Sequence, residues 1–65
     1  MTNYEKAKEK AFERIIRQVM IGKKFEEVQR YIMGMSQAFK IAEFLNADEL
    51  ENFYNECMEK LESQF

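Results

Sequence analysis

The 65-residue sequence contains no histidine, no proline and no tryptophan, and it has only one cysteine and two glycines. Without histidine, and with Cys57 as the single thiol, the chain lacks a zinc-binding set and the partner that usually activates a catalytic thiolate. A single cysteine also excludes an internal disulfide. We therefore expect no catalytic residue, no metal and no cofactor, and a protein that is not an enzyme.

Long apolar segments are also missing. No run of about 18 apolar residues is present to span a membrane, and the N-terminal segment MTNYEKAKEK lacks the apolar core of a signal peptide. The absence of a cysteine framework fits a reducing compartment. We expect a cytoplasmic protein with no membrane partner, and, because no linker composition interrupts the chain, one helical domain over residues 1–65.

The short chain has a thin stability margin. A domain of this size buries only about 60% of its unfolded surface when it folds alone. Natural domains this small gain additional stability from disulfides, metals or oligomerisation. The composition excludes the first two, so oligomerisation remains. A homodimer is therefore predicted.

Residues 25–45, FEEVQRYIMGMSQAFKIAEFL, carry the widest apolar arc of the chain. A helical projection places them on two adjacent seams, and a helix with such a broad apolar surface has to be covered from two sides. We predict one helix over 25–45. The two seams are Phe25, Val28, Ile32, Met35, Phe39 and Ala42, and Tyr31, Gly34, Ala38, Ile41 and Leu45.

Two flanking helices are predicted from their capping signals. Thr2 with Glu5, and Asn46 with Glu49, have capping-box spacing, and Gly22 is a natural helix stop. These signals predict helices over about 2–21 and 47–63. Short connections make consecutive helices antiparallel, so the fold class is all-α, a small up-down-up three-helix bundle. The alternative is an intertwined homodimer in which the 25–45 helices of two chains pair.

Charge is distributed unevenly along the chain. Residues 1–24 carry +4 (seven Lys or Arg against three Glu), residues 25–45 carry −1, and residues 46–65 carry −5. In the predicted bundle the first and third helices lie side by side, so their opposite charges should attract. The first helix also carries a basic face that could bind phosphates. The alternative prediction is therefore a small nucleic-acid-binding protein that uses this face. This face consists of Lys6, Lys10, Arg14 and Arg17, extended by Lys23 and Lys24.

Small residues recur every four positions in the second helix, at Gly34, Ala38 and Ala42. This spacing leaves a shallow groove and predicts that another helix approaches closely there. A helix of the same chain is favoured over one from a second chain.

Met33 and Phe44 project within roughly 20° of each other on the polar side of the predicted 25–45 helix. They are interpreted as apolar anchors of a partner-binding strip, with Arg30, Gln37 and Lys40 as its polar rim. The expected function is a non-enzymatic protein–protein interaction factor that acts through helical surfaces. It would be a regulator, inhibitor or accessory subunit of bacterial or phage origin.

Overall fold

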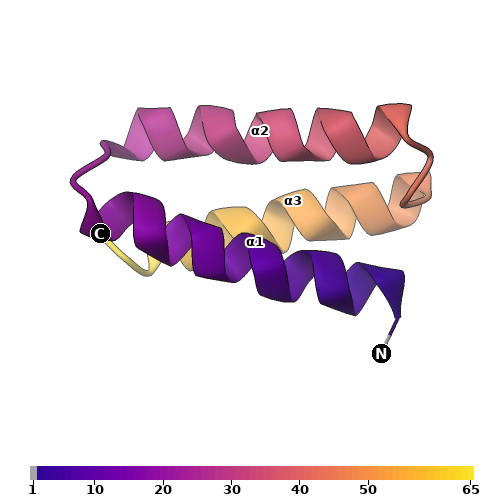
Figure 1. Ribbon diagram of the computed structural model, residues 1–65, viewed down its shortest axis with the longest axis horizontal. Helices are drawn as coiled ribbons and strands as arrows, with labels where there is room; N and C mark the ends of the chain where they lie inside the picture. Colours follow the sequence, from indigo (N-terminus) through magenta and orange to yellow (C-terminus); the bar gives the residue numbers. More distant parts are fainter. Residues whose placement is uncertain (1) are drawn as a thin grey trace.

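Three helices make up the architecture. The computed structural model describes residues 2–65, and within them α1 spans Asn3–Met20, α2 spans Phe25–Ile41 and α3 spans Ala47–Glu62, with no strand. α1 and α3 run in the same direction, α2 runs against both, and each helix contacts the other two (Figure 1). The predicted all-α, up-down-up three-helix bundle is confirmed.

Both ends of α1 follow the signals in its sequence. The Thr2 hydroxyl accepts a hydrogen bond from the Glu5 backbone N–H at 3.1 Å. At the other end Gly22 has a φ of 94°, the left-handed conformation that glycine adopts without strain. The Lys23 N–H donates to the Gln18 carbonyl at 3.1 Å, which completes a Schellman turn. The helix is one residue shorter at each end than the predicted 2–21.

α2 ends at Ile41, so the predicted helix over 25–45 is too long. Glu43 takes the left-handed position after the helix, with a φ of 54°, and the Phe44 N–H donates back to the Phe39 carbonyl at 3.0 Å. These features form a second Schellman turn, with glutamate where glycine is usual. The turn is supported by the stacked rings of Phe39 and Phe44, whose centroids are 5.4 Å apart, and by the burial of Leu45.

The capping box of α3 forms as predicted. The Asn46 side chain accepts from the Glu49 N–H at 2.8 Å, and the Glu49 carboxylate accepts from the Asn46 N–H at 3.0 Å. Asn46 thus starts α3 directly after the turn that ends α2, and the helix ends at Glu62 instead of residue 63.

The core lies along the axis where the three helices meet. α3 supplies its largest buried side chain, Phe53, whose ring packs edge-on against Phe39 of α2 at 5.3 Å between centroids. The buried core residues are Ala7, Ala11, Ile15, Val28, Ile32, Leu45, Phe53, Cys57 and Leu61.

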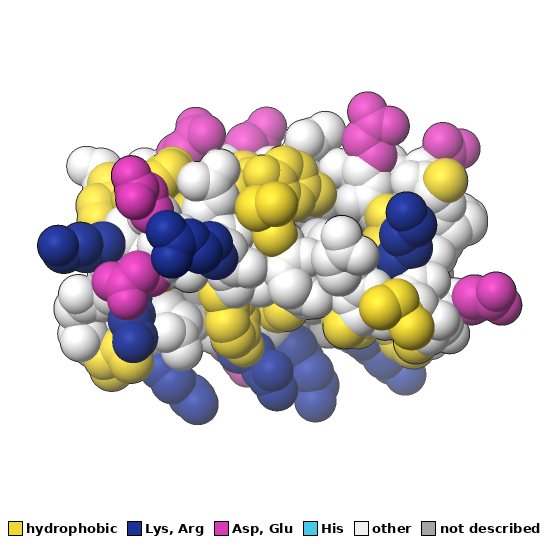
Figure 2. Space-filling view, turned by 90° about the horizontal axis from the view of Figure 1, so that it is seen from above, with side chains coloured by type: hydrophobic (Ala, Val, Ile, Leu, Met, Phe, Trp, Pro, Cys, Tyr) yellow, Lys and Arg dark blue, Asp and Glu magenta, His cyan; other side chains and the backbone are white. Residues whose placement is uncertain are grey.

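The charged faces of α1 and α3 point away from each other. In Figure 2, which looks down onto α2, Lys and Arg side chains gather along one long edge and acidic side chains along the opposite edge. Within residues 2–65, one ion pair joins α1 to α3, between Lys8 and Glu56 at 3.5 Å. The expected attraction between the two helices is therefore limited to this pair, and most of the basic face remains unneutralised.

The same substitution at two isoleucines tests this packing. Ile15 is fully buried, whereas Ile41 is 80% exposed. We expect Ile15→Ala to lower the free energy of unfolding by about 2–5 kcal/mol, a large part of the roughly 3–10 kcal/mol typical of a domain this size. Ile41→Ala should change it by less than about 0.5 kcal/mol. Urea unfolding followed by circular dichroism measures both, and equal losses would contradict the described core.

Candidate functional site

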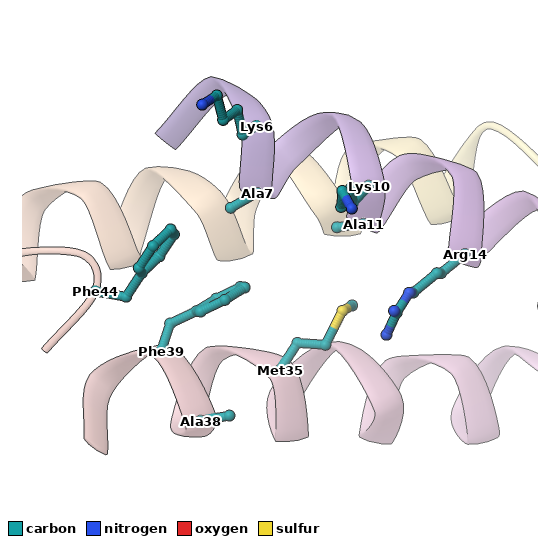
Figure 3. A pocket seen from close by; sticks show the side chains of 9 residues that line it. All are labelled: Lys6, Ala7, Lys10, Ala11, Arg14, Met35, Ala38, Phe39 and Phe44. Atoms are coloured by element: carbon teal, nitrogen blue, oxygen red, sulfur yellow. The ribbon is translucent and has the colours of Figure 1, made fainter. Parts of the chain in front are cut away.

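The candidate site is a groove of about 490 Å³ between α1 and α2 (Figure 3). Met35 and Phe39 extend from α2 toward α1, Phe44 reaches in from the α2–α3 connection, and Arg14 extends from α1 at the opposite end. Six of the nine lining residues are apolar, three are cationic and none is acidic. The lining residues are Lys6, Ala7, Lys10, Ala11, Arg14, Met35, Ala38, Phe39 and Phe44.

The groove exists because the apolar side chains of α1 that face α2 are small. Protein interiors usually pack as densely as organic crystals. On α1, however, the residues that face α2 here are Ala7 and Ala11, and Ala38 stands on the opposite wall. One turn beyond Ala11, the larger side chain of Ile15 is fully buried in the core. The groove therefore opens over the alanine part of α1.

Aromatic rings connect the surface of the groove to the core. Phe44 is 41% exposed and stacks on Phe39, which in turn packs against the fully buried Phe53. The backbone turn after α2 fixes Phe44 in this position, because its N–H is bonded to the Phe39 carbonyl. The apolar wall is thus held from two sides and is available to a ligand.

Three cations follow one edge of the groove at four-residue intervals. Lys6, Lys10 and Arg14 lie on successive turns of α1, about 6 Å apart along its axis. No carboxylate within residues 2–65 forms an ion pair with them, and the polar contact of Arg14 is a hydrogen bond that it donates to the Tyr31 hydroxyl at 3.2 Å. Positive charge therefore lies beside an apolar surface.

The remaining predicted nucleic-acid residues lie outside the groove. Arg17 is exposed on the next turn of α1. Lys23 forms an ion pair with Glu27 at 3.8 Å, and Lys24 occupies the N-cap of α2. The predicted basic face is thus continuous from Lys6 to Arg17 and partly neutralised beyond it.

The predicted partner-binding strip is divided between two sides of α2. Met33, Gln37 and Lys40 line a shallow hollow beside α3, of about 220 Å³, while Phe44 lines the groove beside α1. Arg30 lines neither of them. The reason is the early end of α2, which moves Phe44 away from the position that a continued helix would give it.

Within residues 2–65, no helix approaches Gly34, one of the three small residues of α2 where close packing was predicted. Gly34, Ala38 and Ala42 are exposed, and a Cβ added at Gly34 would meet no atom within 4 Å. The favoured approach by a helix of the same chain is therefore wrong for Gly34. Approach by a second chain stays a prediction.

Cys57 lies in the core, away from the groove. Its side chain is fully buried. Burial first, and the neighbouring Glu56 carboxylate second, raise the pKa of the Cys57 thiol to about 12. The thiol form is inert as a nucleophile, so Cys57 acts as a small core residue.

Tyr4 ties α1 to α3 at the end of the bundle where α1 begins. Its hydroxyl donates a hydrogen bond to the Glu56 carboxylate, which also pairs with Lys8. Loss of solvation raises the Tyr4 pKa to about 12, with further contributions from the hydrogen bond to Glu56 and its negative charge. This cluster is a structural contact on the side of α1 that faces α3.

Residues 2–65 contain neither a cluster of metal ligands nor a helix that could cross a membrane. No group of three or more Cys, Asp or Glu residues there is arranged to hold a metal ion. No helix in the described chain is both long enough and apolar enough to cross a membrane.

Comparison with protein-family models, curated proteins and solved structures finds no match. The groove has to be interpreted from its own chemistry. Sequence reasoning missed the groove, although one signal was present: Ala7 and Ala11 occupy the core stripe of α1 where larger apolar residues would fill the space.

The raised pKa of Tyr4 gives a pH-dependent prediction. The pKa of the Tyr4 hydroxyl is about 12 in the folded protein and 10.0 in the unfolded chain. The protonated hydroxyl therefore stabilises the folded state below pH 10. This contribution to stability is lost as the pH rises from 10 toward 12. The difference in near-ultraviolet absorbance between wild type and Tyr4→Phe should titrate near pH 12 in the folded protein. In concentrated urea it should titrate near pH 10. A folded-state midpoint near 10, with helicity retained, would contradict the part-buried contact with Glu56.

Proposed function

We propose that this chain is a small, non-enzymatic protein–protein interaction factor that acts in the cytoplasm as a regulator, inhibitor or accessory subunit, with the α1–α2 groove as its main contact surface. The observation that carries the proposal is the combination of an open, aromatic-lined apolar groove with an unneutralised basic edge. Apolar anchors surrounded by a polar rim are the usual arrangement of a protein contact surface.

The groove favours a protein over a nucleic acid as ligand. Two thirds of its lining residues are apolar, whereas a nucleic-acid site presents mainly cations and polar groups to phosphates and bases. The net charge of the chain is −2. Nucleic-acid binding is kept as a second candidate because Lys6, Lys10, Arg14 and Arg17 form no ion pair within residues 2–65.

Capture of a partner from cell lysate tests the groove. A tagged protein should recover one partner in stoichiometric amount from nuclease-treated lysate of the cells that make it. Ala38→Glu and Phe44→Asp each place a negative charge in the apolar part of the groove, and both should abolish capture. Met33→Asp adds the same charge beside α3, outside the groove, and should leave capture unchanged.

The outcomes separate the competing surfaces. Capture that survives Ala38→Glu and Phe44→Asp, with helicity intact by circular dichroism, would remove the groove from the proposal. Loss with Met33→Asp as well as Phe44→Asp would restore the strip predicted from the sequence. Recovery of nucleic acid from untreated lysate, falling steeply with salt, would favour the second candidate.

Homodimer formation is a separate part of the proposal. Ile41 is 80% exposed beside the small residues Gly34, Ala38 and Ala42, so the outer face of α2 is open to a second copy. We expect sedimentation equilibrium to give a dimer that Ile41→Asp converts to a monomer. A monomeric wild-type protein at the highest measurable concentration would refute the dimer and leave the groove proposal intact.

A further inference from the structure

We infer that the occupant of the groove is an acidic amphipathic helix of the partner protein. This inference rests on the proposed function and specifies the chemistry of the partner. The partner helix would place one apolar stripe against Met35, Phe39 and Phe44. Its Asp or Glu residues would flank that stripe on the side facing α1.

The dimensions of the groove suit a short helical segment. The cations from Lys6 to Arg14 extend about 12 Å along α1, which equals about two turns of a neighbouring helix. Two turns present apolar anchors at positions i, i+3 or i+4, and i+7, the pattern with which amphipathic helices enter apolar grooves. Aromatic and methionine side chains line the wall that would receive these anchors, and methionine adapts its shape to the surface packed against it.

The spacing of the cations determines the charge pattern of the partner. Lys6, Lys10 and Arg14 recur every four residues, so acidic residues four apart on a partner helix that lies along α1 would meet them in register. The two lysines are exposed, and their contribution is selectivity and rate of association more than affinity. The apolar contacts would supply most of the binding.

Other occupants match this arrangement less well. A fatty acid has one anionic group at one end, whereas the cations are distributed along the groove. The acidic edge of a second copy also fails to match, because the exposed residues of α3 include no large apolar side chain that would fill the groove. They are Ala47, Asp48, Glu51, Asn52, Asn55, Glu59 and Glu62.

Selection from a displayed library of randomised helical peptides tests the inference. The purified wild-type protein should enrich peptides with acidic residues at four-residue spacing next to an apolar stripe. The variant K6E/K10E should instead enrich Lys or Arg at those positions. The matched control R30E/K40E has the same net charge, but its substitutions lie on α2 outside the groove, and it should enrich the same peptides as wild type.

The affinity of a selected peptide for each variant then measures how much the cations contribute to binding. Its affinity should fall about 2- to 30-fold in K6E/K10E, because exposed ion pairs are weak, and the loss should shrink as salt is added. In R30E/K40E the affinity should stay within about twofold of wild type. Circular dichroism of each variant confirms that the helices are intact.

Several results would overturn the inference. The wild-type protein could enrich neutral or basic peptides, or it could enrich the same peptides as K6E/K10E. It could also enrich no peptide at all. If the library gives none of the expected peptides while partner capture still depends on Ala38 and Phe44, the proposed function stands and the acidic helix is wrong. If self-association of wild type is abolished by Phe44→Asp but not by Ile41→Asp, the groove is an interface between copies.

Discussion

The left-handed turn at Glu43 determines where α2 ends and therefore where the next two apolar residues lie. A non-glycine residue in this conformation costs about 1–2 kcal/mol. The burial of Leu45 contributes about 1.5–3 kcal/mol, and the stacking of Phe44 on Phe39 about 0.5–1.5 kcal/mol more. The contacts outweigh the backbone cost, so the chain turns after Ile41 without a glycine.

The same turn creates one wall of the groove. With Leu45 in the core, Phe44 lies over Phe39 at the α1 side of α2 and joins the series of rings that ends at the buried Phe53. The apolar side chains that α1 presents opposite this wall are small, at Ala7 and Ala11. The groove therefore results from two local features. The large side chain of Phe44 is held at the surface, and the small side chains of Ala7 and Ala11 face it.

The sequence predicted those features that local signals determine. Asn46 and Gly22 have backbone roles that their own chemistry sets, and the number and order of the helices follow from these signals and from apolar periodicity. The end of α2 was missed because the apolar pattern continues through Leu45, and the contact that ends the helix is with the rest of the core. The error carried over to the site, since the projected neighbourhood of Phe44 assumed a continuous helix.

Folding alone does not require the charge arrangement beside the groove. Exposed ion pairs contribute only about 0–1 kcal/mol each, so segregating cations on α1 from acids on α3 adds little stability to the bundle. In a domain with so small a core, larger side chains at Ala7 or Ala11 would fill the hollow and bury more apolar surface. An open apolar groove beside Lys6 and Lys10, neither of which forms an ion pair within residues 2–65, is therefore a feature that the fold tolerates but does not require.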